Sequence, residues 1–93
     1  MEPLSHEDAD ARLPELAPNW RREGDALVCE RECANFLDAI GLVNRIAEVA
    51  ERANHHPDLL VHSYKQLRIT LSTHSAGGLT DNDFALAAEI NGL

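Results

Sequence analysis

Aromatic side chains are scarce in this chain of 93 residues, which has one Trp, one Tyr and two Phe. Any hydrophobic core must therefore be built from Leu, Ile, Val and Ala side chains. A chain of this length can bury one modest core but not two, so we expect a single domain over residues 1–93. A small core of this kind often gains stability from association, which favours a homo-oligomer.

Basic residues are also few, because eight Lys and Arg stand against 16 Asp and Glu, for a formal net charge of −8. A surface of this charge repels phosphate backbones and anionic lipids, so we expect no direct binding to nucleic acid. Solubility is the simplest role for the excess of carboxylates.

Long apolar runs are missing as well, since no stretch approaches the ~20 residues that span a bilayer. The start of the sequence lacks the basic and apolar regions of a secretory signal. The only two cysteines, Cys29 and Cys33, would lie on one face of an extended strand, too far apart to bond. These features predict a cytoplasmic protein with reduced, structural thiols and no membrane partner.

Apolar periodicity and turn residues divide the chain into seven elements. Helices are expected over 5–13, over 35–54 and from 80 onward, and strands over 19–23, 26–33, 58–62 and 65–73. The order is α-β-β-α-β-β-α. Hairpin-connected strands covered by helices predict an α+β fold, with a four-stranded antiparallel sheet and three helices packed on one face.

The helix over 35–54 has the clearest pattern, with Asn35 as its N-cap. Pro57 disfavours helical geometry at His56, so this helix should end near Asn54. Its apolar residues form a wide stripe, made of Phe36, Ala39, Ile40, Val43, Ile46, Ala47, Ala50 and Ala53. The strand over 65–73 alternates, with Leu67, Ile69, Leu71 and Thr73 on one face.

Three of the five histidines follow the ends of these two elements. His55 and His56 come at the end of the helix, and His74 comes directly after the strand. Imidazole exchanges a proton near neutral pH. Three imidazoles brought together would therefore suit general acid and base chemistry.

Simpler interpretations exist for each of these residues. Glu51 and His55 are four apart and could form a pair on the helix surface. The adjacent histidines could lie in an exposed loop, and His74 could simply end a strand. Asp83, three residues after Thr80, could complete a capping box.

Zinc held by the three histidines and a carboxylate is a further alternative. Adjacent side chains usually diverge, however, and no HExxH motif is present, which disfavours a metal site. The serines and cysteines lack the sequence context of a catalytic nucleophile.

One spaced pattern connects the histidines with two carboxylates. It consists of Glu51-x-x-x-His55-His56-Pro57, Tyr64, His74 and Asp83. This pattern resembles the signature of the pterin-4a-carbinolamine dehydratases, and the runs over 69–74 and 78–80 are similar to that family's strand and turn. The resemblance is specific from Glu48 to Ile90 and continues more weakly back to Trp20.

The resemblance implies both the fold and the activity. Members of the family have a four-stranded antiparallel sheet with helices on one side, and they associate as dimers or tetramers. They are hydro-lyases that dehydrate 4a-hydroxytetrahydropterin to quinonoid dihydropterin and so support the recycling of tetrahydrobiopterin. The reaction requires neither a redox cofactor nor a metal.

The resemblance also implies roles for individual residues. His55, His56 and His74 would be the catalytic histidines, Glu51 would orient or polarise one of them, and Asp83 would help to hold the site. The residues lining the pterin pocket would be Asn54, Pro57, Ser72, Thr73 and Ser75. The sequence differs from the common family pattern at Asn54, often Asp, and at Leu59, commonly an aromatic.

A non-catalytic role is the alternative, because some relatives of this fold act as dimerisation cofactors or assembly helpers for other proteins. The presence of all three histidines favours the enzyme, since a protein-binding module has no chemical need for them.

Overall fold

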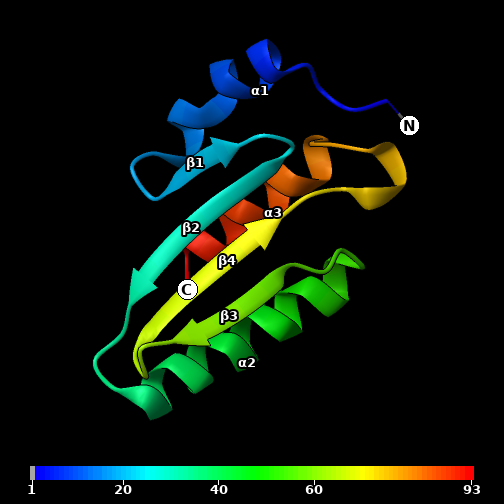
Figure 1. Cartoon of the computed structure of the whole chain (residues 1–93). Helices are drawn as coiled ribbons and strands as arrows, with labels where there is room; N and C mark the ends of the chain where they lie inside the picture. The colour runs from blue at the N-terminus through cyan, green and yellow to red at the C-terminus, as the bar shows by residue number, and fades with distance from the viewer. Residues whose placement is uncertain (1) are drawn as a thin grey trace.

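The computed structural model describes residues 2–93, which form three α-helices, two short 3₁₀ helices and four strands (Figure 1). In chain order these are α1 (His6–Arg12), η1 (Leu13–Leu16), β1 (Trp20–Glu23), β2 (Ala26–Glu32), α2 (Phe36–Ala53), β3 (Asp58–His62), β4 (Gln66–Leu71), η2 (His74–Ala76) and α3 (Asp81–Asn91). The order of helices and strands confirms the prediction. The 3₁₀ helices were not predicted.

The four strands form one antiparallel sheet in the order β1-β2-β4-β3. One row of paired residues crosses the whole sheet, because Trp20 pairs with Cys29, Cys29 with Ile69, and Ile69 with Leu59. Paired residues point to the same face, so this row marks the face turned toward the core. Strand β4 adds three fully buried side chains to that face, those of Leu67, Ile69 and Leu71. The predicted alternation of this strand is confirmed.

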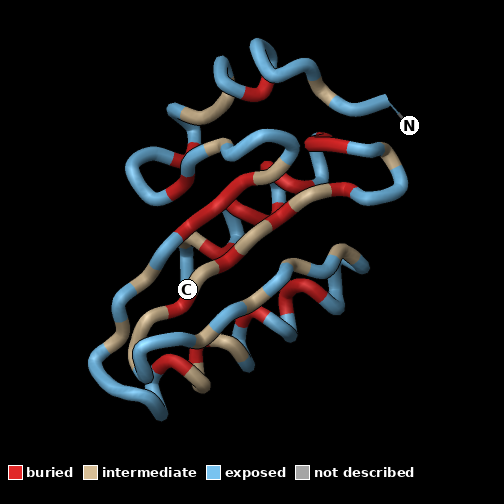
Figure 2. The backbone as a smooth tube through the Cα atoms, in the orientation of Figure 1, coloured by how far each residue is buried: buried red, intermediate tan, exposed pale blue. Residues whose placement is uncertain are grey.

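Helices α2 and α3 pack on this face, while α1 and η1 close the core beside β1 (Figure 1). Figure 2 shows the buried residues concentrated in the two middle strands and in the helices behind them. The architecture is therefore α+β, with a four-stranded antiparallel sheet whose opposite face is left open, as predicted.

Helix α2 begins where its sequence predicts, because the Asn35 side chain accepts a hydrogen bond from the Asp38 amide at 2.8 Å. The buried face matches the predicted apolar stripe only in part. Phe36 is 50% exposed and Ala47 is also exposed, whereas Leu42 and Val49, which are outside the predicted stripe, are buried. A helix on a sheet buries only the strip that touches it, and the rest of the stripe stays on its flank. The buried residues are Ala39, Leu42, Ile46, Val49 and Ala50.

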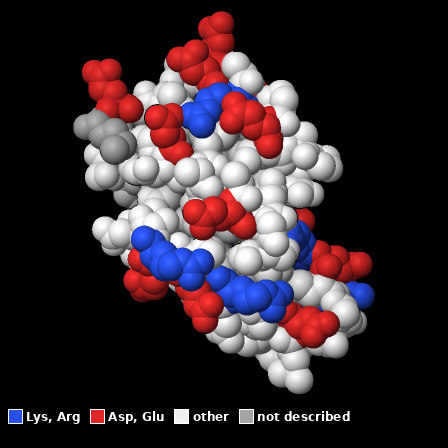
Figure 3. Space-filling view, turned by 180° about the vertical axis from the view of Figure 1, so that it is seen from behind, with Lys and Arg blue, Asp and Glu red and all other residues white. Residues whose placement is uncertain are grey.

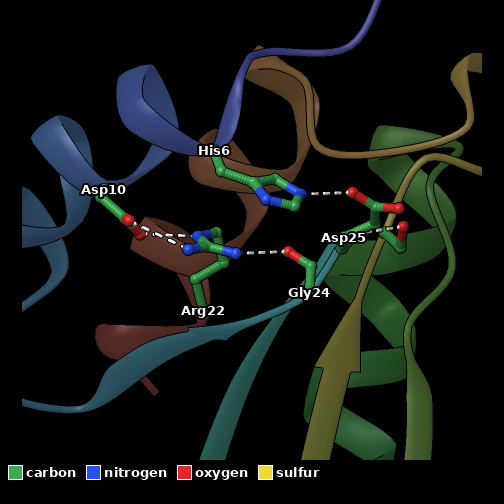
Figure 4. Close-up of polar contacts among 6 residues, drawn as sticks. His6, Asp10, Arg22, Gly24 and Asp25 are labelled. Carbon is green, nitrogen blue, oxygen red and sulfur yellow. Dashed lines mark hydrogen bonds and ion pairs between the residues drawn. The ribbon is translucent and has the colours of Figure 1, made fainter.

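Polar contacts attach α1 to the hairpin formed by β1 and β2 (Figure 4). Arg22 donates to both carboxylate oxygens of Asp10, at 2.6 and 3.0 Å, and to the Gly24 carbonyl oxygen at 2.9 Å. The hydrogen bond from Arg22 lowers the pKa of Asp10 from its ordinary value. His6 Nε2 lies 2.8 Å from Asp25 Oδ1. These contacts are largely exposed, so they orient α1 more than they stabilise the fold.

Basic side chains elsewhere on the surface also lie beside carboxylates. Arg21 contacts Glu23 and Glu30, and Arg12 contacts Asp81. On the face shown in Figure 3, acidic side chains border each group of basic ones. On this face the carboxylates are therefore distributed among the basic side chains.

Candidate active site

A histidine and a fully buried carboxylate form the centre of the candidate site. His55 Nε2 lies 2.6 Å from Asp83 Oδ1, although 28 residues separate the two in sequence. The Asp83 side chain is 0% exposed and that of His55 is 13% exposed. The fold thus joins the chain after α2 to the first turn of α3, and two of the predicted site residues meet.

The end of α2 places His55 in this position. Asn54 adopts a left-handed conformation (φ 50°, ψ 43°), which turns the chain out of the helix. The His55 amide then donates to the Ala50 carbonyl at 3.1 Å, a bond that closes the last turn. Asn tolerates the left-handed region better than most residues, so Asn54 suits this geometry.

We predict that Asn54→Ala lowers the free energy of unfolding by about 1 kcal/mol, because a Cβ-bearing residue without a polar side chain is strained at positive φ. Asn54→Gly should be nearly neutral, since glycine adopts this conformation freely. Urea denaturation of the two variants measures the difference. An equal loss of unfolding free energy in Asn54→Ala and Asn54→Gly would contradict the inference that the backbone conformation selects Asn at this position.

The second oxygen of the Asp83 carboxylate is also fully engaged. Thr73 Oγ1 donates to Oδ2 at 2.7 Å, and the Thr80 amide donates to the same oxygen at 2.9 Å. The bond to Thr80 belongs to a capping box at the start of α3. The capping interpretation and the site interpretation of Asp83 are therefore compatible, because each uses a different oxygen.

This hydrogen bonding determines which nitrogen of His55 carries a proton. A carboxylate oxygen only accepts, so the Nε2 atom facing Asp83 must be the donor. In the neutral ring the lone pair is then on Nδ1. The contact with Asp83 therefore leaves Nδ1 as the ring nitrogen that can accept a hydrogen bond.

His56 points to a different partner. Its Nε2 lies 3.6 Å from Glu51 Oε2, and both side chains are largely exposed. The alternative pair of Glu51 with His55 on the helix surface is not formed, because the turn at Asn54 directs His55 toward Asp83 instead. Glu51 contacts one of the predicted histidines, as the sequence pattern suggested.

His74 begins the short helix η2 and is exposed. Backbone hydrogen bonds hold the turn over 75–78. The Thr73 carbonyl accepts from the amides of Ala76, Gly77 and Gly78, and the Thr73 amide donates to the Gly78 carbonyl. Three amides converging on one carbonyl hold the turn, and that signal is not visible in the sequence.

The predicted pterin-contacting residues differ in their surroundings. Asn54 and Ser75 are exposed, and Pro57 is half-buried. Ser72 donates through its hydroxyl to the Asp25 carbonyl at 2.7 Å. Thr73 is only 6% exposed, and its hydroxyl is bonded to Asp83. Thr80 was not predicted as part of the site. Its position three residues before Asp83, as in a capping box, could have indicated that the two residues are in contact.

Two hollows on the surface are lined by residues other than the three histidines. One, of ≈ 200 Å³, is lined by residues of the N-terminal segment and the start of α3, including Leu4 and Thr80. Another, of ≈ 480 Å³, lies between the end of β2 and α2 and includes Cys33 and Arg45. Neither hollow is lined by His55, His56 or His74.

The chain also carries groups outside this site that could bind a metal or act as a nucleophile. In the part of the chain from residue 2 to 93, His, Cys, Asp and Glu side chains form no cluster of three or more that could hold a metal ion. Both cysteines are free thiols. Burial raises the pKa of the Cys29 thiol, which makes that residue a poor nucleophile.

Comparison with solved structures gives the class of fold. A crystal structure of a transcriptional coactivator/pterin dehydratase from Brucella melitensis matches with a TM-score of 0.88 and 27% identity, over 98% of this chain and 97% of that one. A pterin dehydratase-like protein that is a RuBisCO assembly factor in the alpha-carboxysome shares the fold, with a TM-score of 0.67 and 19% identity over 83% of this chain and 90% of that one. The protein has the pterin dehydratase fold.

Sequence comparisons are more specific. A family model described as pterin 4 alpha carbinolamine dehydratase matches residues 2–93. A relative from Thermomicrobium roseum is 46% identical over 80 residues, 86% of this chain and 85% of the relative. Another, from Nocardia farcinica, is 47% identical over 90 residues, 97% of this chain and 93% of the relative. Both carry the provisional name pterin-4-alpha-carbinolamine dehydratase. The chain belongs to the pterin-4-alpha-carbinolamine dehydratase family.

Between residues 2 and 93, none of the helices is both long enough and apolar enough to cross a membrane.

Proposed function

We propose that residues 1–93 act as one unit, a cytoplasmic hydro-lyase that dehydrates 4a-hydroxytetrahydropterin to quinonoid dihydropterin and water. The observation that carries this proposal is the contact between His55 and the buried Asp83, within a chain of the dehydratase family. In this pair Asp83 engages Nε2 of His55, which leaves Nδ1 as the nitrogen that would accept a proton. The reaction it would serve consists of proton transfers around a single C–O cleavage.

In the proposed reaction the C4a–O bond breaks, and its electron pair leaves with the hydroxyl group. An acid protonates that group, so it departs as water. A base removes the proton from N5, and the electrons of the N–H bond form the N5=C4a double bond. One proton is given and one is taken, so the reaction needs no net proton source and no redox step.

His55 is the proposed base, because Asp83 holds its Nε2 proton and stabilises the cation that forms at Nδ1. His56 and His74 are the remaining candidates for the acid and for contacts to the pterin. Both are exposed and can reach a ligand at the surface. Glu51, whose Oε2 lies 3.6 Å from His56 Nε2, would orient that ring.

The substrate would lie against the loop after α2 and the loop after β4. Asn54, Pro57 and Ser75 are the proposed walls, with Ser72 contributing through the position of its backbone. Exposed apolar residues offer surfaces for the proposed homodimer or homotetramer. They are Phe36, Leu37, Leu60 and Tyr64, from 50% to 78% exposed.

A dehydration assay tests the proposal. We expect purified protein to accelerate loss of 4a-hydroxytetrahydropterin, and His74→Ala and His56→Ala each to lower the rate at least about tenfold, because one acid or base usually contributes 10²–10⁴-fold. His62→Ala is the matched control, since His62 is also exposed but contacts only the neighbouring Ser63. Full activity in both site variants would exclude His56 and His74 as the acid of the proposed mechanism.

A protein-binding role is the second candidate, favoured by the similarity to the transcriptional coactivator/pterin dehydratase from Brucella melitensis. It would use the exposed apolar flank of α2, where Leu37 is 78% exposed. Recovery of one stoichiometric partner by protein without dehydratase activity would support it. Loss of that partner in Leu37→Asp, with Glu48→Asp as the control on the same helix, would locate the surface.

A further inference from the structure

Thr73 connects the two parts of the candidate site. Its side chain bonds to Asp83, the partner of His55, while its backbone holds the turn that carries His74. We infer that Thr73 is a positioning residue, whose hydroxyl orients the Asp83 carboxylate and thereby fixes the tautomer of His55. The inference deepens the proposed function, but the tautomer is a physical property that can be tested without any activity.

The direction of the hydrogen bonds supports this role. Thr73 Oγ1 has one hydrogen, which it donates to Asp83 Oδ2 at 2.7 Å. Thr80 Oγ1 lies 2.8 Å from Thr73 Oγ1 and must therefore be the donor in that contact. The result is a buried chain from the Thr80 hydroxyl through the Thr73 hydroxyl to the carboxylate. Such chains polarise each successive bond in a buried environment.

This series of hydrogen bonds leaves only one oxygen of the Asp83 carboxylate free to accept from His55. Oδ2 already accepts two hydrogen bonds, one from the Thr73 hydroxyl and one from the Thr80 amide. Only Oδ1 remains for the imidazole, at 2.6 Å from Nε2. Without the Thr73 hydroxyl, Oδ2 keeps one donor, and the carboxylate can rotate toward the freed Thr80 hydroxyl. The hydrogen bond between Asp83 and His55 Nε2 is then broken in part of the molecules, and in those molecules no acceptor holds the ring proton on Nε2.

The same residue also stabilises the turn after β4. The Thr73 carbonyl accepts from three amides between Ala76 and Gly78, so the backbone of Thr73 is the anchor of η2. These bonds do not involve the side chain, and a substitution that keeps the β-branched shape preserves them. Thr73→Val therefore removes the hydroxyl while leaving the His74 turn in place.

The experiment compares Thr73→Val with Thr73→Ser, which restores a hydroxyl, and with Thr70→Val. Thr70 is the matched control, because it lies on β4 but on the opposite face of the sheet, paired with Val28 and Asp58. The ¹⁵N shifts of the His55 ring, in mildly alkaline buffer where an ordinary imidazole is neutral, report the tautomer directly. Far-UV circular dichroism confirms that each variant is folded.

We expect the Nε2–H tautomer to dominate in the wild type, in Thr73→Ser and in Thr70→Val, and a mixture of tautomers in Thr73→Val. In the dehydration assay, kcat of Thr73→Val should fall about tenfold or more with KM little changed, as is typical when the partner that orients a functional histidine is removed. Thr73→Ser should recover most of that loss.

An unchanged His55 tautomer in folded Thr73→Val would overturn the inference, whatever the activity. If Thr73→Val does not fold, Thr73→Ala removes the same hydroxyl with less bulk and replaces it in the comparison. If the wild-type protein lacks dehydratase activity but the His55 tautomer still changes in Thr73→Val, the proposed function is refuted. The role of Thr73 is then supported.

Discussion

Asp83→Asn should lower kcat/KM for dehydration by about 10³-fold while leaving the fold intact. The amide has the shape of the carboxylate, and its oxygen can still accept from the Thr73 hydroxyl and the Thr80 amide. Those two donors force the amide NH₂ group toward His55 Nε2. The imidazole must then accept at Nε2 and carry its proton on Nδ1, so the nitrogen proposed as the base can no longer accept a proton.

The expected size follows from the same exchange in serine proteases, where replacing the Asp beside the catalytic His by Asn costs about 10⁴-fold. Asp81→Asn is the control, because it makes the same chemical change two residues earlier on α3 at a side chain that is 86% exposed. We expect that variant to keep activity within about twofold. Asp83→Asn with normal activity would show that His55 does not act as the base through Nδ1.

The fold was predictable because nearly every element has a local signal. Ser5, Asn35 and Thr80 mark the starts of the three helices, and each is an N-cap in the structure. The alternation over 65–73 identifies the strand that lies in the middle of the sheet. Turn residues such as Gly24, at φ 61°, mark the hairpins. Each of these signals depends only on neighbouring residues.

The site was harder to predict because its contacts join residues that are distant in the chain. Only the resemblance to the family placed His55 and Asp83 in one site. The 2.6 Å contact between them depends on how α2 and α3 pack. The sequence did not distinguish the two uses of Thr73, as a pterin contact or as a donor to Asp83. That distinction depends on burial, since Thr73 is 6% exposed.

The second large effect concerns stability, because a core with few aromatics depends on closely packed aliphatic side chains. Ile69→Ala should lower the free energy of unfolding by about 3 kcal/mol, within the range for large-to-small changes in cores. Ile69 is 0% exposed and lies in the row of residues that crosses all four strands. Small domains have only about 5–15 kcal/mol in total, so this variant should be close to unfolding at physiological temperature.

Urea denaturation followed by tryptophan fluorescence measures the effect. Trp20 is the only Trp, is 5% exposed and belongs to the same row, so its emission reports on this face of the sheet. Leu60→Ala is the matched control, because Leu60 is 53% exposed on the edge strand and its loss should cost under about 1 kcal/mol. Equal losses in both variants at every protein concentration would contradict the assignment of the core. A loss in Leu60→Ala that grows as the protein is made more concentrated would instead place that edge strand in an interface between copies, because association stabilises a folded subunit in proportion to the logarithm of concentration.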